Sequence, residues 1–146
     1  MNPFKEKRLC HMAFILERGM EEVWRAQPTT ASTAIEDGAA MKLSSGVVAH
    51  MTTGTKLYGF ARKAKAVGDA STDPVPIAVA KRGQEYRAPV NTGTYATTSP
   101  GGSADVDYAG SQPGKVDLSA SNNDLVVVGG DVTLQEAVVV CINTVY

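Results

Sequence analysis

The sequence predicts a mainly β protein, with a compact antiparallel barrel-like or sandwich-like body and an extended or partly helical N-terminal arm. From Ile35 onward, apolar residues alternate with polar or small ones, as in Met41–Leu43 and Val75–Val79. Glycine-containing turns separate these short runs, and hydrophobic residues make up 43% of the chain, enough to build a core. We therefore divide the chain into an arm and linker, residues 1–34, and a β-rich domain, residues 35–146.

The arm has a different periodicity from the domain. Large apolar residues recur in it at spacings near three and four: Met12, Leu16, Met20, Val23 and Trp24. This spacing allows an amphipathic helix of about three turns. Gly19 weakens that prediction, because glycine inside a helix costs about 1 kcal/mol. Residues 27–33 are rich in threonine and contain a proline, so we expect an extended linker there.

Several further runs indicate strands within the domain. Pro76 lacks an N–H group, so the strand around it is expected to lie at an edge or to leave that position unpaired. Leu125–Val128 and Ala137–Ile142 are continuous apolar runs, typical of strands buried on both faces. The Gly129-Gly130 pair between them predicts a tight hairpin turn.

Composition excludes several classes of function. A formal net charge of −1 argues against a nucleic-acid partner. No apolar run approaches the roughly 20 residues needed to span a bilayer, so we expect a soluble protein made in the cytoplasm without a membrane partner. Cys10 and Cys141 form no disulfide framework and are expected to be free thiols, although a remote bridge between them stays open.

Residues suited to catalysis are sparse. The histidines are His11 and His50, and the one local pair of metal-ligand types is Cys10-His11, whose adjacent positions would point apart on a helix. The chain has no nucleophile-elbow pattern and no phosphate-binding loop. We therefore expect no enzyme activity, no metal and no cofactor.

Contact residues are expected mainly in the arm, because a short helix joined by a polar linker must bury its apolar side somewhere. Trp24 is the best anchor, since large aromatic side chains dominate interface energetics. The candidate capsid or subunit interface comprises Phe4, Met12, Leu16, Trp24 and Arg25. The basic run Arg62–Lys65 suits either a solvated strand edge or docking onto an acidic surface.

A series of motifs in one order carries a family resemblance. The series runs through Ile35-Glu-Asp-Gly38, Met41-Lys-Leu43, Leu57-Tyr-Gly-Phe-Ala61, Val67-Gly-Asp69, Val75-Pro-Ile-Ala-Val79, Lys81-Arg-Gly83 and Tyr86-Arg-Ala-Pro-Val90. The later segments Asp107–Gly110, Gly114–Asp117 and Val126–Ile142 look like the closing part of the same body. In this order the motifs resemble the small β-rich decoration, or cement, proteins of tailed-phage capsids. The arm before Ile35 lies outside the pattern.

The resemblance implies a tulip-like β fold without catalytic residues or cofactor. It also implies binding to the outer surface of the assembled head, often as trimers at local three-fold axes, where such proteins clamp adjacent major capsid proteins. The expected partners are therefore the major capsid protein and further copies of this chain. Deleting residues 1–30 is expected to abolish capsid binding and to leave a folded body.

Two other classes of function remain open. One is another virion structural role, such as a tail-tube, head-completion or fibre-base subunit. The other is a small carbohydrate-binding β module, for which Tyr86, Tyr95 and Tyr108 are the candidate aromatic contacts.

Overall fold

The chain forms β-strands joined by turns and loops. A computed structural model describes residues 14–21, 23–29, 34–52, 54–66, 74–107, 114–119 and 122–146, with residues 23–27 described by their backbone alone. No helix occurs among these residues, which confirms the mainly β prediction. The strands are β1 (Ile15–Arg18), β2 (Val23–Gln27), β3 (Ala40–Ser44), β4 (Val47–His50), β5 (Gly59–Ala61), β6 (Val75–Val79), β7 (Glu85–Thr92), β8 (Ser103–Val106), β9 (Val116–Asp117), β10 (Leu125–Asp131) and β11 (Glu136–Cys141).

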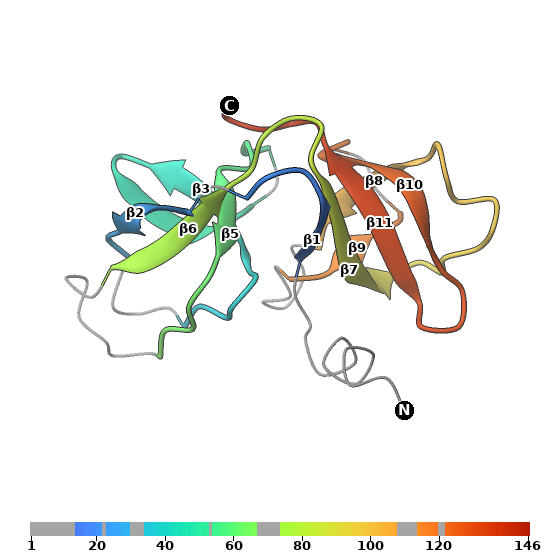
Figure 1. Cartoon of the computed structure of the whole chain (residues 1–146), viewed down its shortest axis with the longest axis horizontal. Coiled ribbons are helices and arrows are strands. Elements are labelled where there is room, and N and C mark those ends of the chain that lie inside the picture. The colour runs from blue at the N-terminus through green and yellow to red at the C-terminus, as the bar shows by residue number, and fades with distance from the viewer. Residues whose placement is uncertain are drawn as a thin grey trace.

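The strands build two sheets that lie side by side (Figure 1). A six-stranded sheet has the order β1-β7-β11-β10-β8-β9, and its neighbours are antiparallel. Strand β7 also pairs in parallel with β9, which matches Val90 with Val116. One end of β7 therefore borders β1 and the other end borders β9.

The five-stranded sheet has the order β2-β6-β5-β3-β4, all antiparallel. Its two outer strands are drawn together, because the N–H of Val48 in β4 donates to the carbonyl of Pro28 just after β2, at 3.0 Å. The C-terminal tail joins this sheet to the other. Leu57 donates to the carbonyl of Asn143 at 2.9 Å and accepts from the N–H of Val145 at 3.0 Å.

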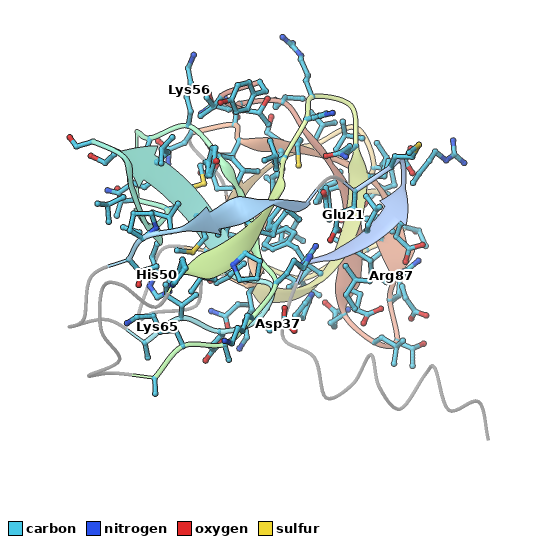
Figure 2. All side chains as sticks on the ribbon, turned by 60° about the vertical axis from the view of Figure 1, so that its left-hand side comes forward. Glu21, Asp37, His50, Lys56, Lys65 and Arg87 are labelled. Carbon is cyan, nitrogen blue, oxygen red and sulfur yellow. The ribbon has the colours of Figure 1, made fainter. Side chains whose placement is uncertain are left out.

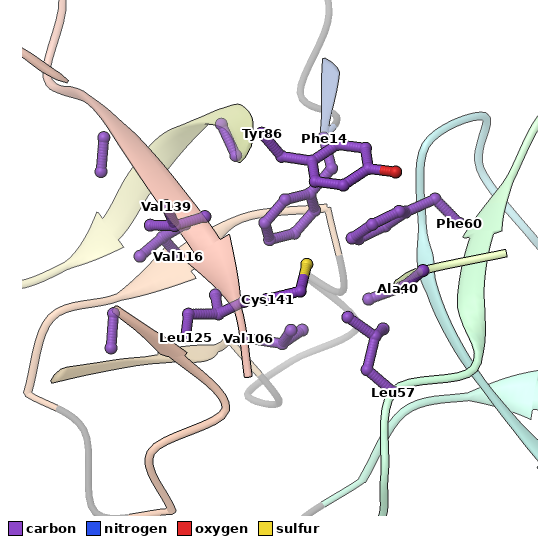
Figure 3. Close-up of a cluster of buried hydrophobic side chains, with 14 of the residues drawn as sticks. Phe14, Ala40, Leu57, Phe60, Tyr86, Val106, Val116, Leu125, Val139 and Cys141 are labelled. Carbon is purple, nitrogen blue, oxygen red and sulfur yellow. The ribbon is translucent and has the colours of Figure 1, made fainter. Parts of the chain in front are cut away.

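One hydrophobic core lies between the sheets (Figure 3). Ala40 and Phe60 enter it from the five-stranded sheet, and Tyr86, Val139 and other buried residues enter from the six-stranded sheet. A second cluster occupies the other face of the five-stranded sheet and includes Met41 and Ala61, the chain neighbours of Ala40 and Phe60. Successive side chains of a strand point to opposite faces, so β3 and β5 supply both clusters.

The N-terminal segment departs from the predicted helix. Its described residues form β1 and β2, and these two strands enter different sheets. Gly19 takes a φ of 113° between them, a backbone conformation that glycine adopts readily and a helix excludes. Phe14 is buried and Leu16 packs against the core, so the inward residues are two apart rather than three or four. The helical form of the arm is therefore wrong for this part, and the extended form holds.

The predicted hairpin at Gly129-Gly130 is also wrong in position. Both glycines lie inside β10, and the turn to β11 spans residues 132–135. The pairing of β10 with β11 skips Val128, because Val127 faces Val139 and Gly129 faces Val138. The glycine pair therefore follows a bulge instead of forming the turn.

Pro76 behaves as its missing N–H group requires. It lies in β6, which is a central strand between β2 and β5. The register with β2 jumps from Ile77 opposite Trp24 to Val75 opposite Gln27, which leaves Pro76 without a partner on that side. On the other side its carbonyl accepts the N–H of Arg62 at 2.9 Å. The unpaired position was the correct alternative of the two expected.

Candidate interaction surface

The predicted contact residues fall partly within the described structure. Phe4 and Met12 lie outside the described residues. Leu16 lies on β1, half-buried against the protein's own core. Trp24 and Arg25 lie on β2, where the backbone of Trp24 pairs with Ile77, and their side chains are outside the description. A role for these five residues in binding stays a prediction.

Phe14, the first described residue, packs the N-terminal segment into the core. Its side chain is fully buried, and its ring stacks on Phe60 with the centroids 4.7 Å apart. Phe60 in turn lies 4.5 Å from the ring of Tyr86, so three aromatic rings from three segments meet between the sheets (Figure 3). The sequence offered a weak signal for Phe14, which is one member of the apolar run 12–16.

Arg62 ties the β1–β2 connection to the end of β5. Its Nε and Nη2 donate to the two carboxylate oxygens of Glu21 at 2.6 and 2.9 Å, and its Nη1 donates to the carbonyl of Phe14 at 3.2 Å. The guanidinium carbon also lies 5.8 Å from the centroid of the Phe60 ring. A two-pronged pair of this kind fixes orientation as well as charge. Arg62 therefore serves the protein's own structure rather than a free basic edge.

Arg87 holds β1 from the β7 side. Its Nε donates to Glu17 at 2.5 Å and its Nη1 donates to Glu136 at 3.4 Å. Burial alone would lower the pKa of Arg87, but the hydrogen bonds and charges of these carboxylates raise it overall. Glu17 is the position that the β1–β7 register skips, and its side chain makes this bond at the bulge. Figure 2 shows Glu21 and Arg87 on the side of the molecule where the N-terminal strands run.

Gln84 completes what we term the N-terminal anchor, formed by Arg62, Arg87, Gln84 and their bonds to residues 14–21. Its Nε2 donates to the carbonyl of Met20 at 2.7 Å. Its Oε1 accepts from the backbone N–H of Lys81 at 2.8 Å and from the hydroxyl of Tyr86 at 3.2 Å. The Met20 backbone is thus fixed while its side chain is 85% exposed.

Groups capable of chemistry are dispersed over the described structure. Among the described residues no cluster of three or more His, Cys, Asp or Glu side chains is placed to hold a metal ion. Burial lowers the pKa of His50, opposed by the charge of Glu36, and its buried Nε2 has no hydrogen-bond partner. Burial raises the pKa of the Cys141 thiol to about 12, so it stays protonated at neutral pH. Cys10 and His11 lie outside the described residues.

The buried carboxylates organise loops. Asp105 accepts hydrogen bonds from the backbone N–H groups of Asn122 and Asp124, at 2.9 and 3.2 Å. Asp107 accepts from the side chains of Asn91 and Thr92, at 2.7 and 2.9 Å. These bonds compensate the cost of burying charge and fix the ends of β7, β8 and β10.

Two of the three tyrosines expected to line a carbohydrate site are buried inside the protein. Tyr86 is fully buried in the core and Tyr95 is 4% exposed, so neither presents a face to a sugar ring. Tyr108 lies outside the described residues. A carbohydrate platform built on Tyr86 and Tyr95 is therefore excluded.

A pocket of about 340 Å³ opens beside the ends of β7, β8 and β9. Its lining consists of small, hydroxyl-bearing and aliphatic residues: Gly93, Thr94, Thr98, Ser99, Gly102, Ser103, Leu118, Ser119 and Val127. The sequence around residues 91–103 is polar and glycine-rich, which is typical of an exposed loop and does not by itself predict a pocket.

Comparison with known proteins supplies no relative. No protein-family model matches the chain, and no curated protein and no solved structure is significantly similar to it. Within the described residues, no helix has the length and apolar character needed to cross a membrane.

Proposed function

We propose that this chain is a structural virion protein that binds the outer surface of an assembled phage capsid and stabilises it by clamping adjacent major capsid proteins. In this proposal it acts as a homotrimer, after synthesis in the host cytoplasm. The proposal rests first on the ordered series of sequence motifs between Ile35 and Ile142. The two antiparallel sheets agree with the expected β body, and the additional β7–β9 pairing supports its barrel-like, tulip-type form.

The observation that carries the proposal furthest is the way the N-terminal segment joins both sheets. Strand β1 pairs with β7 in one sheet, and β2 pairs with β6 in the other. A clamp must pass force from its contact segment into a rigid body. Here, a force applied to the chain before Phe14 would be resisted by the buried Phe14–Phe60 stack and by the N-terminal anchor together.

Binding at several equivalent points would allow each contact to be modest. Within one trimer, binding of one subunit to the lattice raises the effective concentration of the other subunits there, so overall avidity exceeds the strength of a single contact. A body with one shared core holds its contact surfaces in fixed positions for such binding.

Co-sedimentation with phage heads that lack this chain tests the proposal. The purified full-length protein is mixed with heads before and after expansion, and the bound copies are counted against the major capsid protein. Saturable binding to expanded heads at a fixed ratio supports decoration. Absence of binding to either form rejects it, and ring or tube assembly by the isolated protein would favour another virion role.

A truncation locates the contact. The structure places Phe14, β1 and β2 within the body, so the deletion of residues 1–30 is a poor test, because it removes core and sheet along with any contact. Deleting residues 1–13 leaves the described body whole. We expect this variant to lose binding to heads and to keep the far-UV circular dichroism of the full chain. Normal decoration by the variant would remove the arm from the contact and leave decoration itself standing.

A further inference from the structure

We propose that the pocket beside Ser103 binds a short, extended, uncharged peptide segment of a partner protein, which adds to the open edge of β8. The proposal concerns this site alone and stands whether or not the partner is a capsid protein. Its basis is a strand position that has no partner among the described residues on its β9 side, within a neutral pocket that has an aliphatic floor.

The pocket exists because β9 ends early. Strand β9 consists of Val116 and Asp117, and the side chain of Asp117 accepts the N–H of Ser119 at 2.7 Å and its hydroxyl at 2.6 Å. Such a local bond competes with continuation of a strand. The described chain enters a turn at Leu118 and Ser119, and no described residue pairs with the start of β8 on that side.

The hydrogen-bond pattern directs the backbone of Ser103 toward this gap. On one side of β8, Val127 donates to the carbonyl of Gly102, so the residues bonded to β10 are Gly102 and, two positions on, Ala104. On the other side, Asp105 faces Asp117, and Asp107 donates to the carbonyl of Lys115. Bonding alternates along an antiparallel strand, so Ser103 belongs to the β9 side. No described residue pairs with it there.

The lining suits a neutral polypeptide. Leu118 and Val127 supply an aliphatic floor, and the lining carries no charged side chain. None of the described residues hydrogen-bonds the hydroxyls of Thr94, Thr98 and Ser103, which leaves them available as donors and acceptors. The volume falls near the lower end of the range for ligand pockets, roughly 300–1,000 Å³. In β-strand addition, the backbone of the bound peptide forms hydrogen bonds with the edge of a strand, and a side chain of the peptide enters a pocket beside that edge.

Other ligand classes fit less well. A phosphate or carboxylate would want a cation, and the lining has none. A sugar ring would want an aromatic face, and Tyr95, which follows Thr94, is buried. A peptide is the ligand that also uses the unpaired backbone of Ser103.

The test selects peptides and then maps them. A library of uncharged pentapeptides, acetylated and amidated at their ends, is screened against the full-length protein. Enriched peptides are titrated into ¹⁵N-labelled protein, and amide shifts are followed by NMR. We expect the shifts to centre on Ser103 and Leu118. Shifts centred elsewhere, or failure to enrich any peptide, would overturn the proposal. Shifts of the same amides by neutral methyl glycosides, with none from peptides, would also overturn it.

A matched pair of variants tests the backbone bond. Ser103→Pro removes the N–H that faces the pocket, together with the hydroxyl, and fixes φ at this position; proline is tolerated at the first residue of a strand. We expect peptide affinity to fall by about tenfold, the effect of one lost hydrogen bond. Ser103→Ala keeps the N–H and is expected to bind within about threefold of the parent. Equal affinities for the two variants would contradict strand addition.

A second readout uses the unaltered protein and so does not depend on how a variant folds. Each peptide nitrogen of an enriched pentapeptide is methylated in turn. Strand addition predicts an alternating pattern, in which methylation at every second position weakens binding and the positions between tolerate it. A uniform effect along the peptide would reject the proposed geometry.

Discussion

Gly129 and Gly130 are neighbours in β10, yet the structure constrains them differently. A methyl group on Gly130 would overlap the carbonyl oxygen of Glu136 and approach the ring carbon Cζ of Tyr95 to 2.6 Å. On Gly129 it would make an ordinary contact, 3.9 Å from the Cβ of Val138. The buried Tyr95 ring can lie against the strand only because residue 130 has no side chain.

We therefore expect Gly130→Ala to lower the free energy of unfolding by about 1–3 kcal/mol, as overpacking of a filled site does. Gly129→Ala is the matched control and is expected to change it by less than about 1 kcal/mol, because alanine fits an open strand position. Urea denaturation followed by circular dichroism measures both. Equal losses of unfolding free energy for the two variants would show that the Tyr95 ring does not pack closely against Gly130.

His50 gives the fold a predictable response to acid. Burial lowers its pKa in the folded protein below the ordinary value of 6.5, and the charge of Glu36 opposes only part of that effect. The unfolded chain thus binds the proton more readily than the folded chain. The contribution of His50 to stability is present above pH 6.5 and is lost as pH falls from 6.5 through the lowered pKa.

We expect the free energy of unfolding to fall between pH 7 and pH 5, and His50→Gln to flatten that dependence without abolishing folding. Denaturation curves at a series of pH values in this window provide the measurement. A parent and variant with parallel pH profiles would exclude His50 as the titrating group.

At the scale of elements, two ion pairs near β1 are expected to differ in strength. Arg62 and Glu21 form a two-pronged pair, and their side chains are 20% and 23% exposed. Arg18 and Glu85 approach to 3.7 Å, and the Arg18 side chain is 81% exposed. Solvent screens the second pair much more than the first.

Double-mutant cycles with Ala at each position separate these energies. We expect a coupling of about 1–2 kcal/mol for Arg62 and Glu21, since charged, two-pronged hydrogen bonds are the strong ones. The Arg18–Glu85 cycle serves as the control, with an expected coupling below about 0.5 kcal/mol. A coupling near zero for Arg62 and Glu21 would mean that the N-terminal anchor adds little to stability.

Alternation of apolar residues predicted the strands that lie in the body. Met41–Leu43 became part of β3, and Val75–Val79 became β6, including the unpaired Pro76. The helix predicted in the N-terminal arm was wrong, because the spacing of apolar residues there is compatible with both a helical and a strand period. Leu16 and Met20 fit a helical spacing, but Met20 is exposed, whereas Phe14, two residues before Leu16, is buried in the core against which Leu16 packs. Tertiary packing decided between the two periods.

The surface features depend on residues distant in sequence, which explains why sequence reasoning missed them. Arg62 meets Glu21 across 41 positions, and Arg87 meets Glu17 across 70. No local pattern predicts such pairs. The bond that ends β9 is local, between Asp117 and Ser119, but the lining of the pocket comes from segments spread between Gly93 and Val127, so no single segment predicts the pocket.

At the scale of the whole molecule, the two sheets share one core. Phe14, Phe60 and Tyr86 come from three separate segments and meet between the sheets. The C-terminal tail adds a backbone link, through Leu57 and Thr144. Each sheet exposes the face that it buries in this shared core if the other sheet unfolds, so we expect the described body to unfold as one cooperative unit.

Phe14→Ala tests this cooperativity. Removing a buried aromatic side chain is expected to lower the free energy of unfolding by about 3–5 kcal/mol. Met20→Ala, at an exposed side chain of the same connection, is the control and is expected to change it by less than about 0.5 kcal/mol.

Trp24, the single tryptophan, lies on β2 and reports on the five-stranded sheet through its fluorescence, whereas circular dichroism reports on both sheets. Because the core is shared, the two signals are expected to change at one urea concentration in the parent and together at a lower one in Phe14→Ala. A fluorescence transition that precedes the loss of circular dichroism would show that the two sheets unfold separately.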